Sequence, residues 1–171
     1  MEMVYKKADI SALDEVYALI SAAVLLMNEQ GIDQWDEVYP SREDIRRDIE
    51  RGELTAGYVG GDLAVIYVLS RETDEQYANG SWTYSGSDFM VIHRLCVSPS
   101  FQHRGIAGKC LRHIEKDLAA AGIKAVWLDV FTQNPYALRL YAANGYAETG
   151  RTHWRKGEFL LMEKLLDREE R

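Results

Sequence analysis

The stretch from Met90 to Leu118 places the tightest constraint on how this chain can fold. Eight residues of strand character (90–97) lead into a glycine-containing turn (98–109), and a helical pattern follows. The first N–H groups of a helix have no intrahelical partners and lie at the positive end of the helix dipole, so such a turn favours an anion. The turn contains small or basic residues that suit a phosphate group: Arg104, Gly105, Ala107, Gly108 and Lys109. We therefore predict a phosphate site at this helix start.

Length and charge limit the class of protein. The 171 residues suit a single domain over residues 1–171, with a frayed charged tail at 167–171. The 20 Lys and Arg against 27 Asp and Glu give a net charge of −7, which argues against nucleic acid as a partner and suits a cationic small molecule. Apolar runs such as residues 63–69 are far shorter than the roughly 20 residues of a membrane-spanning helix, so no membrane is expected.

The two cysteines, Cys96 and Cys110, fall in a predicted strand and a predicted helix without CxxC spacing, as expected in a reducing cytoplasm. Cys96 as a nucleophile would need a lowered pKa and a base, so a buried strand cysteine is the favoured interpretation. Cys110 and His113 lie three residues apart on one helix, but two further ligands for zinc are missing, and no metal is predicted.

Hydrophobic periodicity and turn residues predict an α/β (α+β) fold. A strand, a helix and a second strand follow one another between residues 90 and 131, which makes the two strands a parallel pair. We expect a mixed, mostly antiparallel central sheet of about six to seven strands with a parallel central pair, flanked by about four helices. The expected strands are 3–7, 54–59, 63–70, 90–97, 124–131, 146–149 and 159–165, and the expected helices begin at Ser11, at Ser41, at the glycine turn and at Asn134.

The spacing of the turn decides between known phosphate-binding motifs. Only two residues separate Gly105 from Gly108-Lys109, which excludes a Walker A loop, and the turn lacks the GxGxxG dinucleotide pattern. The hexapeptide 102–107, QHRGIA, resembles the Q/R-x-x-G-x-G/A signature of the GNAT superfamily of N-acetyltransferases. Val97-Ser98-Pro99 precedes it, Asn134 follows the next strand, and residues 140–146 resemble the L-Y-x-x-x-G-F/Y segment of that family. The resemblance covers residues 1–164.

The resemblance implies the GNAT fold (the acyl-CoA N-acyltransferase fold), acetyl-CoA as cofactor, and acetyl transfer to the amine of a small molecule by direct attack in a ternary complex. Backbone N–H groups of the turn would hold the CoA diphosphate, and the strand before it would hold the pantetheine arm and polarise the thioester carbonyl. The implied cofactor-binding residues are Leu95, Cys96, Val97, Gln102, His103, Arg104, Gly105, Ile106, Ala107, Gly108, Lys109, Asn134, Ala137 and Tyr141.

Two side chains are candidates for proton transfer. Tyr141 matches the family position of the acid that protonates the leaving thiolate, although a packed tyrosine is the alternative. His93 is the candidate base, because strand alternation places it on the side of Leu95 and Val97 and its pKa lies near working pH. A structural histidine, with a glutamate or water chain as base, is the alternative for His93.

Aromatic residues beside carboxylates suggest where the acceptor binds. Trp35, Tyr39 and Trp82 lie near acidic residues in the sequence, which suits an ammonium group, although they could instead cover a sheet edge. The segment 71–88 is expected to be an acceptor-side loop or an extra short strand. A CoA-binding regulatory or pseudo-enzyme domain and a protein N-terminal or lysine acetyltransferase remain as alternative functions. The edge of the closing hairpin allows a homodimer.

Overall fold

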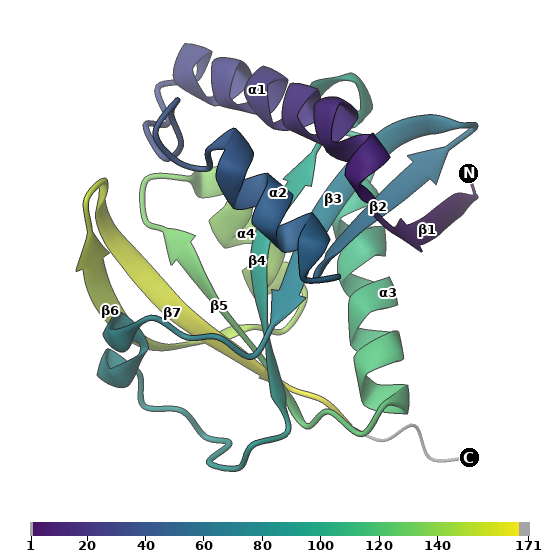
Figure 1. The fold of residues 1–171 in the computed structure, drawn as a ribbon. Helices are drawn as coiled ribbons and strands as arrows, with labels where there is room; N and C mark the ends of the chain where they lie inside the picture. The colour runs from purple at the N-terminus through teal and green to yellow at the C-terminus, as the bar shows by residue number, and fades with distance from the viewer. Residues whose placement is uncertain (1, 168–171) are drawn as a thin grey trace. The chain divides into compact units, whose positions relative to one another are not determined.

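Seven strands form a mixed sheet in the order β1 (Met3–Lys7), β2 (Leu54–Val59), β3 (Asp62–Ser70), β4 (Phe89–Val97), β5 (Ala125–Phe131), β7 (Gly157–Leu165) and β6 (Ala147–Trp154) (Figure 1). The computed structural model describes residues 2–167. β4 and β5 are parallel, from Phe89↔Ala125 to Val91↔Trp127. The pairs β1–β2, β2–β3, β5–β7 and β6–β7 are antiparallel. This confirms the predicted sheet.

Four α-helices accompany the strands: α1 (Leu13–Glu29), α2 (Arg42–Glu50), α3 (Ile106–Ala120) and α4 (Pro135–Ala143). The predicted caps of α2 and α4 are confirmed, since Ser41 forms a capping box with Asp44 and the Asn134 side chain accepts from Ala137 N. The predicted cap at Ser11 is wrong. Asp9 accepts a hydrogen bond from Ser11 N and starts a short 3₁₀ turn, η1 (Ile10–Ala12), which precedes α1.

The described residues group into two compact units. Unit 1 comprises Met1–Leu69 and His93–Ala107, and unit 2 comprises Ser70–Ile92 and Gly108–Arg171. The chain crosses between the units inside β3, inside β4 and inside α3 rather than at a linker, and we keep a single domain over residues 1–171 as a proposal. Of the predicted frayed tail at 167–171, residues 168–171 lie outside the described residues.

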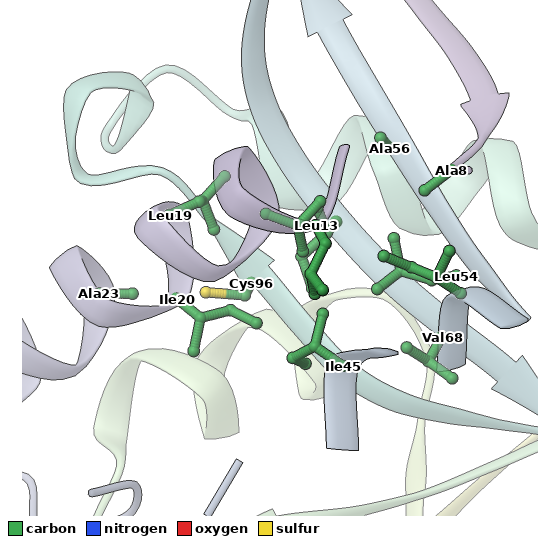
Figure 2. Packing of buried hydrophobic residues seen from close by; sticks show 13 residues of the cluster. Ala8, Leu13, Leu19, Ile20, Ala23, Ile45, Leu54, Ala56, Val68 and Cys96 are labelled. Carbon is green, nitrogen blue, oxygen red and sulfur yellow. The ribbon is translucent and has the colours of Figure 1, made fainter. Parts of the chain in front are cut away.

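The core of unit 1 lies between helices α1 and α2 and strands β2 and β3. Figure 2 shows the sulfur of Cys96, from β4, beside Ile20 and Ala23 of α1. By length and composition alone the segment Ile10–Glu29 is long and apolar enough to cross a membrane, which the prediction from unbroken apolar runs does not include. One face of α1 is buried in this core, as expected for an amphipathic helix of a globular protein.

Unit 2 has an aromatic core. Trp127 of β5 stacks on Phe89 at 3.9 Å and on Trp82 at 4.2 Å between ring centroids. The buried carboxylate of Glu163 accepts hydrogen bonds from the Trp127 indole and from two backbone N–H groups of the 71–88 segment. This segment contains a 3₁₀ helix, η2 (Glu75–Asn79), and not the extra strand given as an option, and it is held by packing and hydrogen bonds within unit 2.

Two leucines on α1 allow a matched test of this core. Leu19 is 6% exposed and belongs to the unit 1 cluster, whereas Leu25 is 62% exposed. We expect Leu19→Ala to lower the free energy of unfolding by about 2–5 kcal/mol, because it removes buried methyl groups and leaves a cavity. Leu25→Ala should change it by no more than about 0.5 kcal/mol. Urea titrations of both variants provide the measurement, and equal losses would contradict the assigned face of α1.

Candidate active site

The turn before α3 exposes its backbone. His103 and Gly105 have positive φ angles of 63° and 73°, and Gly105 is exposed while its neighbour Ile106 is 1% exposed and anchors the start of the helix. A Cβ at Gly105 would meet nothing within 4 Å, so its φ angle, rather than crowding inside the chain, is the reason for a glycine. The predicted turn therefore leaves its main chain open on the side of the missing Cβ.

Basic residues flank this backbone in the sequence. Arg104 and Lys109 are exposed, as is His103, and the Arg104 guanidinium lies 5.3 Å from the centre of the Phe101 ring. The first N–H groups of α3 have no carbonyl partner within the helix, and the dipole adds partial positive charge there. An open main chain, helix N–H donors and basic side chains together fit an anionic phosphate group.

Strand β4 contains a left-handed residue that the sequence did not predict. Arg94 has φ 49°, and its guanidinium forms a bidentate ion pair with Asp48 of α2, at 2.8 Å (Nε–Oδ2) and 2.6 Å (Nη2–Oδ1). The Asp48 side chain is buried, with 6% exposed, and the Arg94 side chain is mostly buried, with 14% exposed. The Arg94 Nη1 also donates to the Tyr39 hydroxyl at 2.6 Å. One side chain thus ties β4 to α2 and to the segment that joins α1 and α2.

This backbone conformation changes the interpretation of the neighbouring strand residues. The two-residue alternation that placed His93 on the side of Leu95 and Val97 is interrupted at Arg94, so that argument for His93 does not hold. His93 itself is half-buried. Cys96 is buried, and burial raises the pKa of its thiol to about 12, which keeps it protonated at neutral pH and disfavours it as a nucleophile.

Tyr141 and Asn134 lie in unit 2 on helix α4. Tyr141 is 8% exposed and meets Tyr146 edge-on, with ring centroids 5.5 Å apart. Burial, with a smaller contribution from the charge of Asp129, raises the pKa of the Tyr141 phenol, so it keeps its proton at neutral pH. A general acid needs that protonated form. The Asn134 Oδ1 accepts from Ala137 N at 3.1 Å and caps α4.

The three predicted acceptor residues fall in different surroundings. Trp35 packs partly buried against the unit 1 core, and Tyr39 is 42% exposed and bonded to Arg94. Trp82 belongs to unit 2, where it stacks with Trp127 and its Nε1 donates to the Tyr77 carbonyl at 2.8 Å. These contacts favour a packing role for Trp82. Among residues 2–167 no group of three or more His, Cys, Asp or Glu is arranged to hold a metal ion.

Residues 29–146 match the family model described as acetyltransferase (GNAT) family. The chain belongs to the acetyltransferase (GNAT) family. The expected family, its acyltransferase chemistry and acetyl-CoA as the acetyl donor of that family are thereby confirmed. The fold agrees. A GNAT acetyltransferase of known crystal structure from Streptococcus agalactiae superposes with a TM-score of 0.86 over 96% of each chain, at 25% identity.

Two curated relatives of this GNAT chain differ in their acceptors. A ribosomal protein bS18-alanine N-acetyltransferase from Salmonella typhimurium is 30% identical over 80 residues, which are 47% of this chain. The match spans about half (54%) of that relative's length. A spermine/spermidine N(1)-acetyltransferase from Bacillus subtilis is 28% identical over 111 residues, which are 63% of this chain and 67% of the relative. The names of these relatives share an N-acetyltransferase activity and differ in the kind of acceptor.

The sequence contains a weak signal for the Arg94–Asp48 pair. Arg94 is a charged residue inside the apolar run 90–97, and Asp48 follows the buried Ile45 by three residues on α2. A charge at a buried position calls for a partner of opposite sign. Each residue therefore indicates that a partner of opposite charge exists, but no neighbouring residue in the sequence shows which one it is.

Removing the acidic partner tests the importance of this pair. We expect Asp48→Asn to lower the free energy of unfolding by about 3 kcal/mol or more, because it leaves the buried Arg94 guanidinium without its counter-charge. Asp14→Asn is the matched control, since Asp14 pairs with Arg42 at the surface and is 85% exposed. That change should cost less than about 1 kcal/mol. Urea unfolding measures both, and a wild-type midpoint for Asp48→Asn would contradict the proposed importance.

Proposed function

We propose that this chain transfers the acetyl group of acetyl-CoA to the amine of a small-molecule acceptor by direct attack in a ternary complex. The observation that carries the proposal is the turn before α3, where two left-handed residues, His103 and Gly105, leave the main chain open beside basic side chains. Family membership supplies the chemistry. When bound, acetyl-CoA would provide the activated acetyl group.

The proposed roles follow the family motif residue by residue. The backbone of residues 102–109 holds the diphosphate, and the backbone of 95–97 holds the pantetheine arm and polarises the thioester carbonyl. Asn134 and Ala137 contribute to the cofactor site from the start of α4. Tyr141 Oη donates a proton to the leaving thiolate, and its burial supports this role by keeping the phenol protonated.

Two observations support a small amine as acceptor. The net charge of −7 favours a cationic molecule, and the B. subtilis relative named for spermine and spermidine matches 63% of this chain. A protein N-terminus is the second candidate, favoured by the bS18-alanine relative from S. typhimurium. We assign Trp35, Tyr39 and Trp82 to acceptor binding. Of the three, Trp82 has the least support, because its ring packs against Trp127.

An acceptor screen tests the proposal. The protein is incubated with acetyl-CoA and with a panel of small amines or with peptides beginning with alanine, and release of free thiol is followed. Turnover with small amines supports the proposal, and turnover with peptides alone supports the second candidate. Acetyl-CoA binding with no turnover on either panel would favour a regulatory domain without catalysis.

Tyr141→Phe tests the general acid. The substitution removes one hydroxyl from a buried ring and keeps the packing against Tyr146. We expect kcat to fall by about 10²–10⁴-fold, the usual contribution of a positioned proton donor, while acetyl-CoA affinity stays within about twofold. Tyr136→Phe on the same helix is the control, since Tyr136 is 48% exposed. Unchanged kcat in Tyr141→Phe would remove the residue from the mechanism.

His93→Ala tests the proposed base. A histidine that accepts the proton of the acceptor amine gives the pH–rate profile an acidic limb near its ordinary pKa of about 6.5. We expect the variant to lose this limb. A profile of unchanged shape would leave His93 with a structural role.

We further propose a cytoplasmic location, for which the two buried cysteines, neither of them in a disulfide, give support. A homodimer through the edge of the closing β6–β7 hairpin also stays a proposal, and sedimentation velocity at micromolar concentration would test it.

A further inference from the structure

Asp129 occupies an unusual position in unit 2. Of the seven residues of β5, six are buried, and Asp129 is the one that keeps partial access to solvent. Its neighbours along the strand are Leu128 and Val130, which are 1% and 2% exposed. A partly exposed carboxylate within an otherwise buried apolar strand is the one polar group of β5 that a solute can meet from solvent.

A buried tyrosine contacts this carboxylate directly. The Tyr77 hydroxyl donates to Asp129 Oδ2 at 2.7 Å, and Tyr77 is 4% exposed. The Tyr77 ring stacks on Trp82 at 5.5 Å and lies 6.4 Å from the ring of Trp154. Burial and the charge of Asp129 raise the pKa of the Tyr77 phenol well above its ordinary value, so the hydroxyl stays a donor to the carboxylate.

Asp129 also lies near the proposed general acid. Helix α4, which contains Tyr141, packs against β5, and the negative charge of Asp129 acts on the Tyr141 phenol. Tyr141 is 8% exposed. Within unit 2 a carboxylate and two phenols, Tyr77 and Tyr141, thus come together where β5 is accessible to solvent.

An alkylammonium group fits this chemistry. The two oxygens of an ionised carboxylate can accept about four hydrogen bonds between them, so Asp129 can hold an ammonium group as well as the Tyr77 hydroxyl. A neutral or anionic acceptor would gain nothing from this carboxylate.

We propose that Asp129 binds the cationic ammonium group of the acceptor and thereby selects alkylamines as the substrate class, with Tyr77 positioning the carboxylate. The assignment rests on the proposed acetyl transfer for its biological meaning, and the binding itself requires no turnover. Asp129 is then a specificity-determining residue, and Tyr77 acts through it.

Binding measurements test whether Asp129 holds the ammonium group, and kinetics test whether this selects the acceptor. Binding of primary alkylamines with one to four amino groups, including spermidine, is measured by calorimetry on the wild type, Asp129→Asn, Tyr77→Phe and Asp117→Asn. The last variant loses the same charge on α3, at a side chain that is 66% exposed. We expect Asp129→Asn to weaken binding by about 10- to 100-fold, Tyr77→Phe to weaken it less, and Asp117→Asn to leave it within twofold.

Kinetics on an active wild type give a second readout. KM for the alkylamine should rise in Asp129→Asn while KM for an arylamine, uncharged at pH 7.5, stays within about twofold. Absence of alkylamine binding to the wild type, or equal affinity in Asp129→Asn, overturns the inference. Alkylamine binding that depends on Asp129 without any acetyl transfer supports the inference and contradicts the proposed function. Melting temperatures check that each variant folds. If Asp129→Asn does not fold, Tyr77→Phe still provides the test.

Discussion

The buried ion pair between Arg94 and Asp48 is the contact on which the organisation of unit 1 depends. Two charges removed from water are costly unless each meets a partner with good geometry, and here the bidentate pairing satisfies both. The pair fixes the strand that follows His93 to helix α2, and through Tyr39 it also fixes the segment between α1 and α2. A hydrophobic pair in the same place would bury apolar surface, but it would lack the directional hydrogen bonds that hold Arg94 in its left-handed conformation.

The elements that could be predicted are those with local causes. The capping box at Ser41 and the cap at Asn134 each depend on residues within three positions of one another, and the structure has both. The helix after the glycine turn has the same kind of local cause, since the turn and the helix that it starts are adjacent in sequence. The predicted helix start at Ser11 is wrong, because the neighbouring Asp9 is the capping residue and starts a 3₁₀ turn.

The features that could not be predicted bring distant residues together. Arg94 and Asp48 are 46 residues apart, and Tyr77 and Asp129 are 52 apart. A lone charge in an apolar run shows that some partner is needed, but many acidic or aromatic residues in the chain could supply it. The conformation of Arg94 is likewise a property of the folded environment, and it defeats the simple alternation on which the expected orientation of His93 was based.

The turn before α3 has a consequence for how sequence change would act on this protein. The proposed phosphate-binding surface is main chain, which every amino acid carries, so the side chain at Gln102 can change in size and charge without removing the N–H donors. His103 and Gly105 do not share this freedom, since their φ angles of 63° and 73° disfavour most side chains. The proposed acceptor site is built from side chains such as Asp129, so one substitution there can change which acceptor binds. Sequence change therefore alters the choice of acceptor more readily than the binding of the acetyl donor.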